Sequence, residues 1–350
     1  MTQTTNYASV LAKIGAERSK LLNEAKLKTL TEIKNLPELT AQLRDTSYQE
    51  QIAKVPLPLT SRNIERAFHE NLIATTTKII KNSPKYTTDY LNMYIYKFES
   101  ENIKLLIKAT NAKLSPEQKL ARIHLSVEDY LKNRVVIEEA AKAQSMKQTV
   151  NNLKINEYSL ALNMGLQSYE ENGSTTCFDV LLDKEFHEKL YNRYENLPQK
   201  EKTYAQFYTR IENDSFTLLS LLRGKNLNYD ANWLRLAVPS NNFNIHKETV
   251  EAMVTAIDFE SALKVALNTY YAGFFVRGQN SEEAIANAEK AFRNEVYHHA
   301  KTSIISEIFN IGTTLSFITQ KEAEVHNLTA ISSGVEATIN PEEIQRQLLL

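Results

Sequence analysis

Three acidic residues stand at matching places in three stretches of the chain, and each is followed three residues later by a polar side chain. The pairs are Glu99 and Asn102, Asp214 and Thr217, and Glu324 and Asn327. Residues three apart in a helix lie on one face, so each carboxylate and its partner would project together. Carboxylates can serve as general acids and bases, and this is the first chemistry that these residues suggest.

The residues around these pairs favour a structural role instead. Ile103 and Leu106 have apolar counterparts in Leu328 and Ile331, 225 residues later. Polar side chains beside an apolar stripe can fix how two helices cross. We therefore interpret the six polar residues as a packing motif that bonds a neighbouring helix end or, in the first stretch, Lys108. The alternative is that the three carboxylates line an inner surface, but carboxylates in three separate parts of the chain are not expected to meet at one substrate.

Other sequence patterns for catalysis or ligand binding are missing. The chain has no phosphate-binding loop, no Gly-x-Gly-x-x-Gly and no Gly-x-Ser-x-Gly. None of the seven histidines forms a His-x-x-x-His pair, and the adjacent His298 and His299 would point about 100° apart on a helix. Cys177, the one cysteine, has no neighbouring base. We expect no enzyme activity, no cofactor and no metal.

The elements that would carry the pairs are helices. Apolar residues recur at helical spacing along most of the chain, and eight glycines and eight prolines leave little material for turns. One helix should end near Asn111. Others should start at Thr60-Ser61, Ser115-Pro116, Ser281 and Asn340-Pro341, where a capping side chain or an N-terminal proline is in place. The sequence therefore predicts an all-α protein.

The repeats divide the chain into three helical units, at 1–118, 119–235 and 236–350. Further matches follow the same order, such as Thr46-Ser47-Tyr48 with Thr269-Tyr270-Tyr271. Lys and Arg exceed Asp and Glu by 5 in the first unit, equal them in the second and fall 6 short in the third. Such a charge distribution is typical of a protein whose different parts bind differently charged partners. The basic residues are dispersed, which argues against nucleic-acid binding.

Composition and length agree with a soluble protein of a reducing compartment. Apolar residues make up 42% of the chain, no run of about 18 apolar residues occurs, and the first residues do not resemble a signal peptide. A single cysteine excludes an internal disulfide.

A set of short motifs, in order along nearly the whole chain, resembles the C subunit of the archaeal-type (A/V-type) rotary ATPase, which is related to the d subunit of the vacuolar ATPase. The motifs are residues 18–22, 43–48, 99–104, 114–117, 221–225, 321–328 and 340–344. The resemblance implies three pseudo-equivalent helical bundles around a pseudo-threefold axis, as a funnel. It also implies a non-catalytic rotor part between the membrane proteolipid (c/K) ring and the D and F shaft subunits. Such a part would lie on the cytoplasmic side and contact the membrane only through the ring.

A rotor part needs a stable interface with each of its two neighbours. As candidate interface charges we choose Arg18, Lys20, Arg223 and Lys225; the alternative is that they are ordinary surface charges. A different function, a stand-alone helical-repeat scaffold that binds other proteins, would predict a linear stack with a long groove rather than three units closed around an axis.

Overall fold

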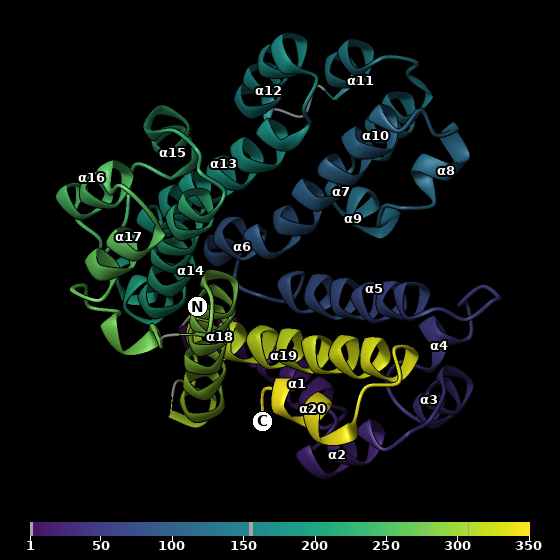
Figure 1. The fold of residues 1–350 in the computed structure, drawn as a ribbon. Coiled ribbons are helices and arrows are strands. Elements are labelled where there is room, and N and C mark those ends of the chain that lie inside the picture. The colour runs from purple at the N-terminus through teal and green to yellow at the C-terminus, as the bar shows by residue number, and fades with distance from the viewer. Residues whose placement is uncertain (1–2, 154–156, 277, 307) are drawn as a thin grey trace. The chain divides into compact units, whose positions relative to one another are not determined.

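The computed structural model describes residues 3–153, 157–276, 278–306 and 308–350, and within these ranges the secondary structure is helical, with no β-strand (Figure 1). The predicted all-α class is confirmed. The chain forms two compact units, one made of Met1–Thr88 with Asn294–Leu350 and the other of Asp89–Arg293. The division into three repeats is a division of the sequence, and it stays a prediction.

The first unit is built around one long helix from the C-terminal part of the chain. This helix, α19 (Ile311–Glu336), is buried on nearly all sides and packs most extensively along α5 (Ser61–Ile80), as Figure 1 shows. The other helices are α1 (Gln3–Arg18), α2 (Glu24–Thr31), α3 (Leu36–Leu43), α4 (Gln49–Ile52) and α20 (Pro341–Gln347). Four of these, α1, α2, α3 and α20, contact α19 directly. Most residues of α19 are buried, as expected of a helix at a core, and its buried charges Lys321 and Glu324 pair with each other.

The second unit contains the two other long helices that carry the repeated motif. These are α7 (Met93–Asn111) and α14 (Gln199–Asn226), and both pack against α13 (Thr176–Glu195). The shorter helices α8 (Pro116–Leu120), α9 (Leu125–Leu131), α10 (Arg134–Lys142), α11 (Met146–Asn152) and α12 (Ser159–Asn172) follow α7. After α14 come α15 (Ala231–Ala237), α16 (Lys247–Thr255), α17 (Phe259–Ala266) and the 3₁₀ turn η1 (Ala272–Phe274). Helices α6 (Lys85–Leu91) and α18 (Ser281–Ser306) belong partly to each unit.

The predicted helix starts are confirmed, and local side chains explain them. Ser115 accepts from the backbone N–H of Gln118, whose side chain accepts from the Ser115 N–H in return, a reciprocal cap. Thr60 caps α5 and Asn340 caps α20 by one-way bonds, in which the side chain accepts from an N–H group of the first turn. Helix α18 begins at Ser281 as expected, but the cap is the side chain of Asn280.

Candidate functional site

The three carboxylates of the repeated motif lie on the long helices α7, α14 and α19. All three are removed from solvent: the exposed fraction is 0% for Glu99, 0% for Asp214 and 4% for Glu324. A buried carboxylate must find hydrogen-bond donors or a cation, or else take up a proton. The three residues meet this requirement with different partners.

Glu324 is ionically paired and bonds two distant segments of the first unit. Its Oε1 accepts from the Tyr48 hydroxyl at 2.6 Å and from Lys321 Nζ at 2.7 Å, and its Oε2 accepts from the backbone N–H of Leu22. The Lys321 ammonium also lies 4.1 Å from the centre of the Tyr48 ring. Burial lowers the pKa of Lys321 even though Glu324 opposes this, and burial together with the Glu324 charge raises the pKa of Tyr48 well above its usual value.

Asp214 shows the same arrangement in the second unit. It accepts from the backbone N–H groups of Phe243 and Asn244, at 2.8 Å each, and from the Tyr271 hydroxyl at 2.7 Å. Tyr271 is the residue that the sequence comparison aligned with Tyr48. Burial raises the pKa of Asp214, and the three donors act against this rise.

Glu99 has the poorest set of donors. Its Oε1 accepts from the Asn133 side chain at 2.6 Å, while its Oε2 has no hydrogen-bond partner within the described part of the chain. A second buried carboxyl, Glu128, lies close enough to repel it. Burial first, and then the Glu128 charge, raise the pKa of Glu99 to about 8, and burial raises the pKa of Glu128 to about 7. Tyr158, buried beside this pair, donates instead to the carbonyl of Tyr96, at 2.8 Å.

Two of the three polar residues that follow the carboxylates, Asn102 and Asn327, bond the backbone of another segment. Asn102 donates to the carbonyl of His124 and accepts from its N–H, at 3.0 and 2.7 Å. Asn327 makes the same pair of bonds with Leu349, at 2.8 and 2.7 Å, and both partners lie 22 residues after the asparagine. Thr217 differs, since its hydroxyl donates to the Asn242 side chain at 2.7 Å.

The packing interpretation of the motif stays a prediction, and these contacts are compatible with it. Asn102 holds His124, which is the residue that begins α9, so the expected bond to a helix end is present. The expected bond to Lys108 is absent from the described residues, where Lys108 instead pairs with Asp179 at 2.8 Å. Each carboxylate is therefore enclosed in its own set of contacts.

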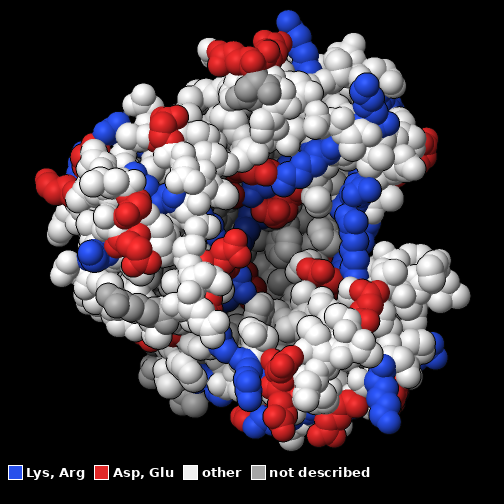
Figure 2. Space-filling model, in the orientation of Figure 1, with Lys and Arg blue, Asp and Glu red and all other residues white. Residues whose placement is uncertain are grey.

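The four candidate interface charges differ in how freely they could meet a partner. Arg18 is exposed at the end of α1, and Lys20 is half exposed and pairs with Glu17 at 3.1 Å. Arg223 is exposed and pairs with Glu289 at 2.5 Å. Lys225 instead donates to the carbonyls of Val254 and Ala256, where it satisfies the C-terminal end of α16. Figure 2 shows acidic and basic side chains interspersed over the visible face.

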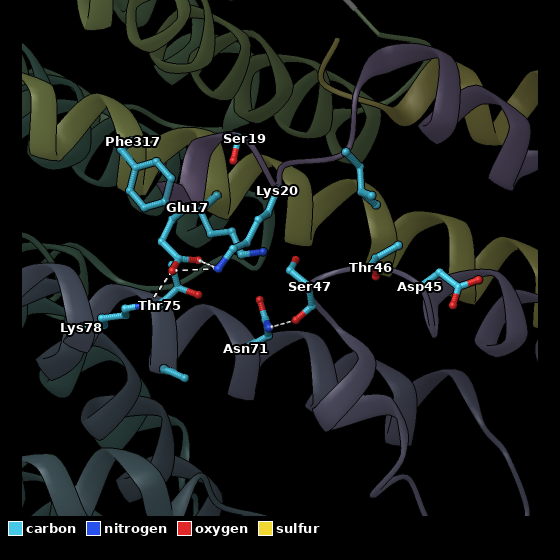
Figure 3. A pocket seen from close by; sticks show the side chains of 13 residues that line it. Glu17, Ser19, Lys20, Asp45, Thr46, Ser47, Asn71, Thr75, Lys78 and Phe317 are labelled. Carbon is cyan, nitrogen blue, oxygen red and sulfur yellow. Dashed lines mark hydrogen bonds and ion pairs between the residues drawn. The ribbon is translucent and has the colours of Figure 1, made fainter. Parts of the chain in front are cut away.

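A polar cavity that the sequence did not predict lies in the first unit. It has a volume of about 650 Å³ and is lined by residues of α1, α5, α19 and the segment before α4 (Figure 3). Among these residues are Glu17, Lys20, Ser47, Asn71 and Lys78. Of these five, Lys20 and Ser47 lie in motifs that the sequence analysis singled out, whereas Glu17, Asn71 and Lys78 follow no repeat or motif spacing. None of the three repeated carboxylates lines this cavity.

Two further features are absent from the residues that the structure describes. None of their helices combines the length and the apolar character that a membrane crossing requires. Nor do their His, Cys, Asp and Glu side chains include a group of three or more placed to hold a metal ion.

Comparison with known proteins gives one consistent match. A family model described as ATP synthase (C/AC39) subunit matches residues 10–347. The C subunit of the A-type ATP synthase from Methanocaldococcus jannaschii is 28% identical, over 98% of this chain and 86% of its own length. The proteins of the same name from Methanothermobacter thermautotrophicus and Thermococcus kodakarensis are each 24% identical, over 98% and 97% of this chain and 87% and 90% of their own lengths.

Proposed function

Since this chain belongs to the ATP synthase (C/AC39) subunit family, we propose that it is a non-catalytic central-stalk (rotor) subunit of an A/V-type ATPase or ATP synthase. In this role it couples the membrane proteolipid ring to the shaft formed by the D and F subunits. The observation that carries the proposal is the family match, which extends over almost the entire chain.

The repeated contacts support the threefold funnel that the resemblance implies. Glu99 of the first repeat bonds Asn133 near the start of the second, and Asp214 of the second bonds Phe243 near the start of the third. Glu324 of the third repeat bonds Leu22 near the start of the first. This is a cyclic order of contacts. In a linear stack the last repeat would have no successor, so the Glu324 contact favours the rotor proposal over the helical-repeat scaffold.

A rotor part transmits torque and catalyses no reaction. Long helices, packed on one another and tied by buried polar contacts, give the required stiffness. The protein would lie at the cytoplasmic face of the membrane and reach it only through the ring. Each of its two interfaces should bury more than about 1,000 Å² to resist slipping. Of the candidate charges, Arg18, Lys20 and Arg223 remain proposed contacts, whereas Lys225 has a role within the protein.

Co-purification tests the proposal. Tagged chain extracted from its own membranes in mild detergent should bring down proteolipid ring, shaft and catalytic-head subunits, and the isolated chain should hydrolyse no ATP. Recovery of none of these subunits, with the tagged chain itself recovered and folded, would contradict the proposed function.

A further inference from the structure

The polar cavity of the first unit contains a buried acceptor with no hydrogen-bond partner in the described part of the chain. This acceptor is the amide oxygen of Asn71, a residue with an exposed fraction of 6%. The Asn71 amide nitrogen donates to the Ser47 carbonyl at 2.7 Å and to Gln51 Oε1 at 3.0 Å. Because the Ser47 carbonyl can only accept, the amide nitrogen must face it and the amide oxygen must face the other way. Figure 3 shows that oxygen turned to the open space between Asn71 and Lys20.

A second polar atom in the same cavity is also unsatisfied. Neither Asn71 Oδ1 nor the buried hydroxyl oxygen of Ser47 has a partner within the described part of the chain. A buried polar group without a partner destabilises the fold, so two in one cavity call for an explanation. A ligand that brings a hydrogen-bond donor into the cavity would supply what both atoms lack.

The opposite side of the cavity carries excess positive charge. Lys20 and Lys78 both contact Glu17, with nitrogen–oxygen distances of 3.1 and 2.6 Å. Burial would raise the pKa of Glu17, but the hydrogen bonds from Lys78 and Lys20 hold the pKa below its usual value, so the carboxyl is ionised. Two ammonium groups therefore share one carboxylate. Each ammonium has three N–H donors, and those not used on Glu17 remain available to a further anion.

We propose that this cavity receives an acidic polypeptide segment of a partner protein in the complex. The carboxylate of an Asp or Glu side chain would bind Lys20 and Lys78, and a backbone N–H of the same segment would donate to Asn71 Oδ1. A peptide carries both groups a few ångströms apart, which matches a cavity with cationic donors on one side and a neutral acceptor on the other. The volume of about 650 Å³ lies within the range of small-ligand sites. This inference rests on the proposed function, since the segment belongs to a partner in the complex.

A covalent label attached inside the cavity tests whether the cavity takes part in binding a partner subunit. Thr75 lines the cavity, whereas Thr77, on the same helix and similarly half-buried, does not. Thr75→Cys and Thr77→Cys variants would be labelled with a maleimide of moderate size. The natural Cys177 is buried, and mass spectrometry of the unaltered chain would verify that it takes no label. Binding of each adduct to purified D–F shaft and to purified proteolipid ring is then measured by biolayer interferometry.

The labelled Thr75→Cys protein should bind one of the two partners at least tenfold more weakly than its unlabelled form, and the labelled Thr77→Cys protein should bind as before. Unchanged binding of the Thr75→Cys adduct to both partners overturns the inference and leaves the proposed function standing. If the unaltered chain binds neither partner, the proposed function fails together with the inference.

A matched pair of charge reversals tests the acidic character of the segment. Lys20 and Lys28 have exposed fractions of 50% and 48%, and each pairs with a glutamate three or four residues before it, but only Lys20 lines the cavity. Lys20→Glu should weaken the same partner at least fivefold, and Lys28→Glu less than twofold. Tighter binding by Lys20→Glu would mean a basic segment and would overturn the proposal, as would equal effects of the two variants. Circular dichroism verifies that both variants are folded.

Discussion

Glu99 and Asp214 occupy matching positions in their helices, yet their surroundings differ in how well they stabilise an ionised carboxylate. Three N–H or O–H donors converge on Asp214, and donors of this kind favour an ionised acceptor. Glu99 has one donor, an unpaired oxygen in the described structure, and a second carboxyl nearby. With its pKa raised to about 8, Glu99 holds its proton at neutral pH. The same position of the repeat therefore has three hydrogen-bond donors in one copy and a single donor in another.

Amide substitutions at Glu99 and Asp214 should change the free energy of unfolding by different amounts. Glu99→Gln replaces a neutral carboxyl by a neutral amide of the same shape, so we expect the free energy of unfolding at pH 7 to change by less than about 1 kcal/mol. Asp214→Asn turns an amide N–H₂ towards groups that are themselves donors, and should lower the free energy of unfolding by about 2–4 kcal/mol. Urea denaturation followed by circular dichroism measures both. Equal losses for the two variants would contradict the neutral state of Glu99 and the role of the three donors around Asp214.

The raised pKa values of Glu99 and Glu128 also predict a pH dependence of stability. Between the usual carboxyl value, 4.5, and the raised values of about 8 and about 7, the folded protein binds more protons than the unfolded chain. Stability supplied by these protons is fully present below pH 4.5 and is lost as the pH rises through 7 to 8. The slope is at most about 1.4 kcal/mol per pH unit for each group.

Urea midpoints measured from about pH 5.5 to about pH 9, a window that spans both raised values, should therefore fall as the pH rises. Glu99→Gln should flatten this fall. Neighbouring charges that face Glu99 include Glu157 and Lys189, which are present in both proteins, so the difference between the two curves reports the titration of Glu99 together with its coupling to Glu128. Identical curves for the variant and the unaltered protein would rule out Glu99 as a titrating group in this range.

At the scale of helices, the sequence predicted where several helices begin or end, because those signals are local. It did not predict which helices pack together. The end of α7 and the starts of α8 and α20 follow from caps and prolines close by in the sequence, and each was predicted. The position of Glu99, Asp214 and Glu324 on packed helix faces also follows from local spacing. The bond from Tyr48 to Glu324, across 276 residues, does not, since it depends on which helices pack together. The matching places of Tyr48 and Tyr271 were visible in the sequence, but nothing there identified the carboxylates as their acceptors.

The contact between α19 and the end of the chain gives a prediction at this scale. The Asn327 side chain bonds both backbone groups of Leu349, which is itself buried. Asn327→Ala should leave both groups of Leu349 unpaired, lower the free energy of unfolding of the first unit by about 2–3 kcal/mol, and speed amide hydrogen exchange at residues 348–350. Asn152→Ala, which removes one exposed bond to the Glu139 carbonyl, is the control and should cost less than about 0.5 kcal/mol. Unchanged exchange at the C-terminus would show that Asn327 does not hold it.

At the scale of the whole chain, one compact unit is continuous in sequence and the other is assembled from both ends. The apolar core cluster of the first unit joins Tyr7, Val10 and Ile14 of α1 to Ile79 of α5 and Phe317 of α19. Residues 1–88 alone therefore lack the helix against which α1 and α5 pack. The second unit contains its own long helices and needs no segment from either end.

Fragments of the chain should show this difference. Residues 84–306, which keep α6 and α18 whole, should fold alone and unfold cooperatively in urea, because α7, α13 and α14 pack on one another. Residues 1–88 alone should lack a cooperative transition, since without α19 their buried apolar side chains face water. Addition of a 294–350 fragment should restore a cooperative transition and the hydrogen-exchange protection of α5, which packs along α19. Cooperative unfolding of residues 1–88 without that fragment would mean that α19 is not the centre of the first unit.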